Sequence, residues 1–305
     1  MRTALSKRFR RVSKHVYQSI RWRTLDRPKL LMIVGCQRSG TTLMSLLFDA
    51  DRDCRVFGEF SALSCVGKDG IRLNPLPDVA AVLSRVPAPL VVMKPLVETQ
   101  RVSTLLSYFP NSKALFMYRR YADVASSDLR KFGPRNAIDN IRPIATGDTH
   151  NWRSAGATPA VREHVARFFS ESMNPNDAAA LFWFARNQLY YDLELAARGE
   201  VMLCRYEHLT TEPSAIMRRI YGFAGVTCPD LSHTRQVHSS SVSKGKRLEL
   251  LPEVRALCEQ LQARLDAQYE LQSKVPAVAG STAQACEPRL QSAVLQSEGA
   301  GPFTG

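Results

Sequence analysis

The chain has 305 residues, of which 45% are hydrophobic, enough to bury the core of one large domain. No apolar run approaches the roughly 18 to 20 residues of a bilayer-spanning helix, and the first 30 residues contain no apolar segment of the secretory kind. We therefore expect a cytoplasmic protein that does not span a membrane. The formal net charge of +13 is uneven, because residues 1–29 carry ten Lys or Arg residues against Asp26 alone, which gives +9 there and +4 elsewhere. Such charge attracts anionic partners without identifying them.

The basic arm, residues 1–28, has the pattern of an amphipathic helix. Apolar residues recur at spacings of three and four, at Leu5, Phe9, Val12, Val16 and Ile20. The favoured interpretation is that this apolar side packs on the domain. Docking on the inner membrane surface is the next alternative, and we expect no nucleic-acid partner.

Strand and helix patterns alternate along the rest of the chain. Short apolar runs at 30–34, 90–93, 114–118 and 201–204 predict buried strands, and helical patterns occur at 41–50, 101–109, 123–131 and 178–197. Alternation of this kind predicts an α/β fold with a central parallel β-sheet flanked by helices, in three layers. Ligands bind beyond the carboxyl ends of such strands, which directs attention to residues 35–42, Lys94 and Arg119.

Composition divides the remainder of the chain. We assign the catalytic domain to residues 29–272, and within it 133–177 is rich in Gly, Pro and Asn and suits an insertion over the acceptor side. Residues 254–265 predict a final helix. From 273 to 305 the sequence turns to Ser, Ala, Gly, Gln and Pro, and we expect a disordered tail.

The segment that follows the first strand has the spacing of a phosphate-binding loop. Successive backbone N–H groups and a helix N-terminus would face an anion there, so the loop is P-loop-like. Thr41 occupies the position of the Walker lysine, which is the main charge partner of the β- and γ-phosphates of a nucleoside triphosphate. A shorter anion is therefore expected. The donor residues assigned to this loop are Gln37, Arg38, Ser39, Gly40, Thr41 and Thr42.

Two motifs together resemble the sulfotransferases that use 3′-phosphoadenosine 5′-phosphosulfate (PAPS). The family loop R-S-G-T-T is present from Arg38 to Thr42, and the family pattern R-x-x-x-D-x-x-x-S is present as Arg119, Asp123 and Ser127. The resemblance implies that the loop binds the 5′-phosphosulfate, whereas Arg119 and Ser127 bind the 3′-phosphate. An Arg119–Asp123 salt bridge at a helix start is the structural alternative.

Other segments extend the resemblance less specifically. Tyr206 begins a segment similar to the family's Tyr-Glu-Asp-Leu, so it either lies near the nucleotide or belongs to the core. Lys244 and Gly245 lie in a Ser- and Lys-rich stretch similar to the mobile basic loop that closes over the donor, and a solvated loop is the alternative.

The resemblance also implies catalytic residues. Lys94 matches the lysine that reaches the donor's bridging oxygen, with Arg38 as a second cation, while Leu96 stands where the small-phenol enzymes carry their histidine base. Glu59, in Gly58-Glu59, matches the glutamate of tyrosylprotein and some bacterial sulfotransferases, and is the expected general base unless it only pairs with an arginine.

The predicted activity is sulfuryl transfer from PAPS to a hydroxyl or amine, with no metal site, because no Cys, His or Asp cluster has ligand spacing. A small-molecule kinase and a non-enzymatic anion-binding module are the alternatives. The acceptor stays open among carbohydrate, lipid, small metabolite and peptide tyrosine.

Overall fold

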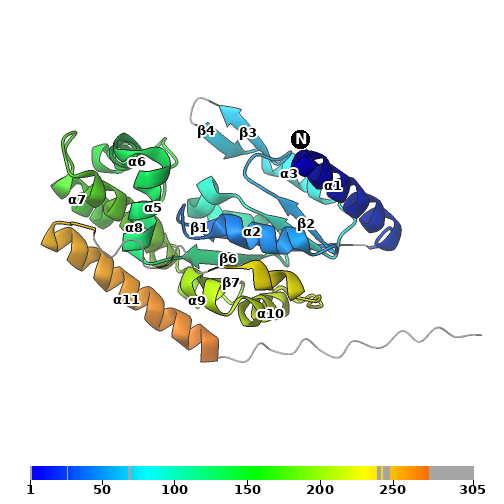
Figure 1. Cartoon of the computed structure of the whole chain (residues 1–305). Helices are drawn as coiled ribbons and strands as arrows, with labels where there is room; N and C mark the ends of the chain where they lie inside the picture. The colour runs from blue at the N-terminus through cyan, green and yellow to red at the C-terminus, as the bar shows by residue number, and fades with distance from the viewer. Residues whose placement is uncertain (1, 26, 68–69, 239–241, 243–247, 275–305) are drawn as a thin grey trace, which may run out of the picture.

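The computed structural model describes residues 2–25, 27–67, 70–238, 242 and 248–274, with side chains from residue 12 onward. Its centre is a five-stranded sheet in the order β2-β5-β1-β6-β7, in which all neighbouring strands are parallel (Figure 1). The strands are β1 (Lys29–Gly35), β2 (Cys54–Phe57), β5 (Leu90–Met93), β6 (Lys113–Tyr118) and β7 (Val201–Arg205). A separate antiparallel hairpin is formed by β3 (Ser64–Gly67) and β4 (Gly70–Leu73). The four predicted strands are confirmed.

Helices cover both faces of the sheet. One layer contains α2 (Thr41–Ala50), α9 (Tyr206–Thr211) and α10 (Pro213–Ala224). The opposite layer contains α3 (Leu76–Leu83), α4 (Val102–Tyr108), α5 (Tyr121–Phe132), α6 (Pro134–Thr146), α7 (Pro159–Phe168), α8 (Pro175–Asp192) and α11 (Pro252–Lys274). Short 3₁₀ segments complete the chain at Leu96–Arg101, Leu195–Ala197 and Ser232–Gln236. The predicted three-layer α/β fold is therefore confirmed.

Alternation along the strands divides the core into two halves. On β1, Leu31 and Ile33 pack toward α2 and α10, whereas Met32 and Val34 pack toward the other layer, and all four are fully buried. A strand buried on both faces must be apolar at every position, which is why the run at 30–34 is continuous.

The basic arm forms α1 (Arg2–Arg21), at the end of the molecule away from α6 and α7 (Figure 1). The helix is confirmed, but the expectation that its apolar side packs on the domain is wrong. Val16 and Ile20 are 53% and 76% exposed, whereas Gln18 is 1% exposed. The helix is held by polar contacts instead, because the turn beneath it offers backbone carbonyls rather than apolar surface.

The structure also bears on the predicted insertion at 133–177 and on the C-terminal stretch from residue 273. Residues 133–177, predicted as an insertion, contain α6, α7 and the start of α8, so this region is mainly helical. The helix α11 continues through Ser273 and Lys274, two residues into the stretch expected to be disordered, and Ser273 Oγ donates to the Tyr269 carbonyl at 2.7 Å. Residues 275–305 lie outside the described part of the chain.

Candidate active site

The loop between β1 and α2 depends on backbone conformations that only certain residues adopt. At Gly35 (φ 122°) a Cβ would lie 2.2 Å from the carbonyl oxygen of Met117, so only glycine lets β1 approach β6 here. Arg38 (φ 66°) and Gly40 (φ 89°) are left-handed, and a Cβ on Gly40 would lie 2.2 Å from the ring of Tyr206. These positions turn the chain sharply from the strand into α2.

The turn ends in an anion-binding arrangement. Gly40 is the N-cap of α2 and provides no side-chain cap, so the first-turn N–H groups have no capping side chain. The Ser39 side chain is fully buried, and its hydroxyl has no hydrogen-bond partner within the described residues. A buried hydroxyl without a partner is costly, and an anionic oxygen at this loop would satisfy it. The residues therefore fit the 5′-phosphosulfate of the donor.

Arg119, which follows β6, is held in place before any ligand binds. It is 4% exposed, its guanidinium lies over the Tyr206 ring at 4.3 Å, and its Nη2 is 3.9 Å from Oδ2 of Asp123. Trp183 fixes the backbone by donating from its indole N–H to the Arg119 carbonyl at 2.9 Å. Burial lowers the pKa of Arg119, but a guanidinium stays protonated at neutral pH. The Arg119–Asp123 salt bridge, given above as the structural alternative, is therefore present. Tyr206 is buried, and its ring lies against both Arg119 and Gly40 of the donor loop.

Ser127, on α5, connects the two predicted donor motifs. Its hydroxyl accepts a hydrogen bond from Nε of Arg38 at 3.1 Å, and Nη1 of Arg119 lies 3.5 Å from the Arg38 carbonyl oxygen. The side chain of Gln37 donates to Oδ1 of Asp128, also on α5, at 2.9 Å. The donor loop, Arg119 and α5 therefore form one connected unit, although 81 residues separate Arg38 from Arg119.

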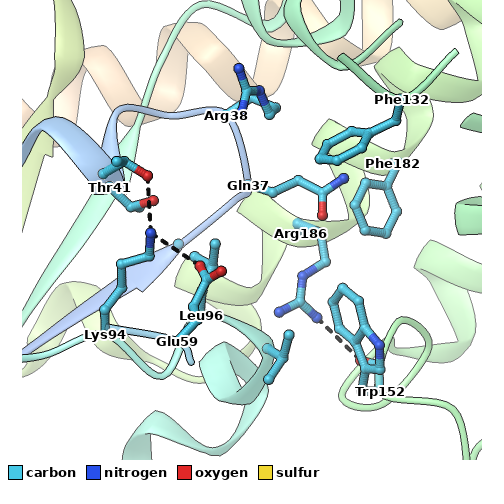
Figure 2. A pocket seen from close by; sticks show the side chains of 13 residues that line it. Gln37, Arg38, Thr41, Glu59, Lys94, Leu96, Phe132, Trp152, Phe182 and Arg186 are labelled. Carbon is cyan, nitrogen blue, oxygen red and sulfur yellow. Dashed lines mark hydrogen bonds and ion pairs between the residues drawn. The ribbon is translucent and has the colours of Figure 1, made fainter. Parts of the chain in front are cut away.

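Lys94 and Glu59 meet because they follow neighbouring strands. In the register of β2 with β5, Phe57 lies opposite Met93, and the Lys94 amide donates to the Phe57 carbonyl at 3.0 Å. Lys94 Nζ donates to Thr42 Oγ1 at 3.1 Å and lies 3.1 Å from Oε1 of Glu59 (Figure 2). Glu59 thus forms an ion pair, but with the expected catalytic lysine rather than with an arginine.

One pocket joins this polar group to an aromatic wall. Its polar part comes from the predicted residues, with Lys94 and Glu59 at one end of the view in Figure 2 and Arg186 and Trp152 at the other. The lining residues are Gly35, Gln37, Arg38, Thr41, Thr42, Glu59, Lys94, Leu96, Val97, Phe132, Trp152, Phe182 and Arg186. Ser39, Gly40, Arg119, Ser127 and Tyr206 do not line this pocket, and Lys244 and Gly245 lie outside the described residues.

Sequence reasoning missed the aromatic wall. Phe132 ends α5, Trp152 follows α6, and Phe182 and Arg186 lie one helical turn apart on α8. Only Trp152 falls in the segment expected to cover the acceptor side. The available signal was an arginine directly after the apolar run 178–185 of α8, since a buried arginine is unusual.

Comparison with known proteins agrees with this geometry. Residues 28–260 match the sulfotransferase domain family, and the chain therefore belongs to that family. A comparison with curated proteins found no match.

Among solved structures, the sulfotransferase domain from the curacin biosynthetic pathway has 16% identity and a TM-score of 0.51, with 78% of this chain and 98% of that one covered. The sulfotransferase domain from the Synechococcus PCC 7002 olefin synthase has 15% identity and a TM-score of 0.50, with 80% and 96% covered. At these identities the likeness shows the shared fold.

The protein is a sulfotransferase, an enzyme that transfers a sulfuryl group with PAPS as the donor, as its family does. Membership of this family replaces the two alternatives left open by the sequence, a small-molecule kinase and a non-enzymatic anion-binding module. Within the described residues, no cluster of three or more His, Cys, Asp or Glu could hold a metal, and no helix is long and apolar enough to cross a membrane.

Proposed function

We propose that the protein transfers the sulfuryl group to an acceptor hydroxyl or amine by in-line displacement, with Glu59 as general base and with Lys94 and Arg38 as the cations. The observation that carries this assignment is the position of Lys94 Nζ, 3.1 Å from both Glu59 Oε1 and Thr42 Oγ1. A base, a cation and the donor loop therefore meet at one point.

The chain's residues would divide the reaction as follows. The α2 N-terminus and Ser39 bind the phosphosulfate, and Arg119 binds the 3′-phosphate. The acceptor oxygen or nitrogen attacks sulfur while the bond from sulfur to the bridging oxygen breaks, and negative charge builds on the leaving phosphate next to Lys94. Glu59 accepts the acceptor's proton. Lys94 pairs with Glu59 until the donor supplies a competing anion.

The acceptor would enter along the aromatic wall. Phe132 and Phe182 lie on the same side of the pocket as Arg186, facing Lys94 and Glu59 across it (Figure 2). Leu96 lines the pocket where the small-phenol enzymes are expected to carry histidine, which supports Glu59 as the base.

Carbohydrate, lipid, small metabolite and peptide tyrosine stay open as acceptors. A cytoplasmic location is supported by the six described cysteines, which are all free thiols.

Donor and metal dependence test the proposal directly. With ³⁵S-labelled PAPS and pooled acceptors, we expect label transfer that continues in excess chelator, because cationic side chains stabilise the leaving group and Thr41 replaces the Walker lysine. ATP labelled at the γ-phosphate, the matched control, should give no transfer. Loss of turnover with chelator and its recovery with magnesium would contradict the proposed mechanism.

A further inference from the structure

The amphipathic helix α1 presents its apolar side to solvent. Val12, Val16 and Ile20, spaced by four residues, are 56%, 53% and 76% exposed. We call these three residues the apolar stripe. In the sequence, Leu5 and Phe9 precede them at the same three- and four-residue spacing, within the bounds of the same helix.

The opposite side of α1 is fixed to the domain by polar contacts. Gln18 Nε2 donates to the carbonyls of Arg52 and Cys54 at 2.8 and 3.0 Å, and Lys14 Nζ donates to the carbonyl of Asp49 at 2.9 Å. Gln18 is two residues after Val16, which on a helix is a rotation of about 200°. The helix is therefore anchored in a defined orientation, and that orientation directs the apolar stripe outward.

Further contacts strengthen the anchor. The Trp22 indole N–H donates to Oδ1 of Asp53 at 2.7 Å, and the guanidinium of Arg52 lies 4.1 Å from the centre of the Tyr17 ring. Tyr17 on α1 and Trp22 just after it thus contact the turn between α2 and β2. The polar side is engaged and the apolar side is left exposed, the reverse of the usual arrangement for a surface helix.

The charge around the stripe identifies the kind of partner. Residues 1–29 carry a net charge of +9, and Arg21, Arg23 and Arg27 are exposed next to the end of the stripe. A second copy of this chain would bring two such charges together, which opposes pairing. Nucleic acid would satisfy the arginines and leave valine and isoleucine in water. A membrane with anionic headgroups satisfies both, because acyl chains accept the apolar side chains while phosphates attract the arginines.

We propose that α1 is a docking helix that binds the surface of an anionic lipid membrane through Val12, Val16 and Ile20, with the catalytic domain held beneath it by Lys14, Gln18 and Trp22. This binding does not depend on the identity of the acceptor or on the proposed roles of the active-site residues.

Vesicle co-sedimentation of the full chain tests the proposal. We expect binding to phosphatidylcholine vesicles that contain a quarter of phosphatidylglycerol at about 0.1 M salt, and much weaker binding to pure phosphatidylcholine. The double variant V16S/I20S should lower the partition coefficient about tenfold or more, because two apolar side chains no longer enter the interface. The control L251S/L271S removes two exposed leucines near and on α11 and should bind as the parent does.

Several outcomes would overturn the proposal. Equal binding of V16S/I20S and the parent would show a purely electrostatic contact, and lack of binding to anionic vesicles would exclude a lipid surface. Light scattering that shows a parent dimer and a monomeric V16S/I20S would identify the stripe as a contact between copies. Donor binding, measured by calorimetry with adenosine 3′,5′-bisphosphate, should be the same in the parent and in both double variants, and it reports that all three proteins are folded.

A second inference rests on an independent observation, the buried cation at the aromatic end of the active-site pocket. Arg186 is 2% exposed, and its partners are neutral: Gln100 Oε1 at 3.1 Å from Nη2 and the Trp152 carbonyl oxygen at 3.4 Å from Nη1. No described carboxylate lies within ion-pair distance of it, and the nearby Glu98 is bound by Arg72 and Arg101 instead. Burial lowers the pKa of Arg186 to about 10, so it stays charged at neutral pH.

A buried charge is costly unless an opposite charge compensates it. Because Arg186 lines the same pocket as Lys94 and Glu59, the geometry points to an acceptor that carries a carboxylate-like anionic group in addition to its reacting hydroxyl or amine. Its apolar body would contact Phe132, Phe182 and Trp152. This inference rests on the proposed function, since it assigns the acceptor side of the same pocket.

Two phenols of similar size, one anionic and one neutral, test the inference on enzyme saturated with adenosine 3′,5′-bisphosphate. By calorimetry, 4-hydroxybenzoate should bind at least about tenfold more tightly than 4-hydroxybenzyl alcohol. Arg186→Met should remove the difference and Arg186→Lys should retain part of it. Equal affinities in the parent, or an unchanged preference in Arg186→Met, would overturn the inference. If Arg186→Met does not fold, Arg186→Lys decides: a reduced but measurable preference supports the inference, and an undiminished preference contradicts it. The affinity for adenosine 3′,5′-bisphosphate itself, measured first, reports separately on the donor site.

Discussion

Glu59→Gln is expected to lower turnover by about 10² to 10⁴, the usual contribution of a positioned acid or base. The amide keeps the shape of the side chain and can still accept a hydrogen bond from Lys94, but it cannot take the acceptor's proton. Affinity for adenosine 3′,5′-bisphosphate should stay within a few-fold of the parent. Single-turnover transfer from labelled PAPS, with a productive acceptor supplied, measures the effect.

The ion pair with Lys94 suggests a competing role for Glu59, in which its carboxylate only positions the lysine. If the carboxylate only positions that lysine, Glu59→Gln should weaken donor binding and reduce turnover by less than about tenfold, as expected for the loss of a partly exposed pair. Glu200→Gln is the matched control, because Glu200 is an exposed carboxylate 3.8 Å from Arg198 and is not among the residues that line the pocket. Near-parental turnover of Glu59→Gln would show that the proton leaves by another route.

Arg119→Ala is expected to weaken binding of adenosine 3′,5′-bisphosphate about 100-fold, close to 3 kcal/mol, while AMP binding changes little. We expect a loss of this size because the buried guanidinium makes charge-assisted hydrogen bonds to the 3′-phosphate, which AMP lacks. The parent should therefore prefer the bisphosphate, and the variant should lose most of that preference. Calorimetric titration with both nucleotides measures the difference.

Two controls separate recognition from folding. Arg120→Ala removes an exposed arginine from the next position and should leave both affinities near parental values. Arg119→Lys keeps a charge near Asp123, so it should unfold close to the parental temperature and show an intermediate preference. Equal affinity of the parent for AMP and the bisphosphate would contradict the assignment of a 3′-phosphate site to Arg119.

The elements that sequence predicted well are those with strong local signals. The apolar runs became β1, β5, β6 and β7, and the helix expected at 41–50 has those bounds in the structure. The edge strand β2 was missed because four residues that include Arg55 carry neither a continuous apolar run nor clear alternation. In the region 133–177, which was predicted only as an insertion, Gly133, Pro134, Gly147 and Pro159 stand at helix ends, where they start and stop helices.

The sequence by itself predicted the donor loop, because its signal is contiguous: Arg38 to Thr42 follow an apolar strand, and Arg38 and Gly40 have left-handed backbone in the structure. The sequence also supplied the amphipathic pattern of α1, but periodicity describes a helix without saying which side meets the protein. Tertiary structure decided that, through carbonyls of the turn at 49–54 that bind Gln18 and Lys14. It also brought Glu59 to Lys94 through the pairing of β2 with β5 and set Arg186 in the pocket wall, because contacts between residues distant in sequence follow from strand order and helix packing.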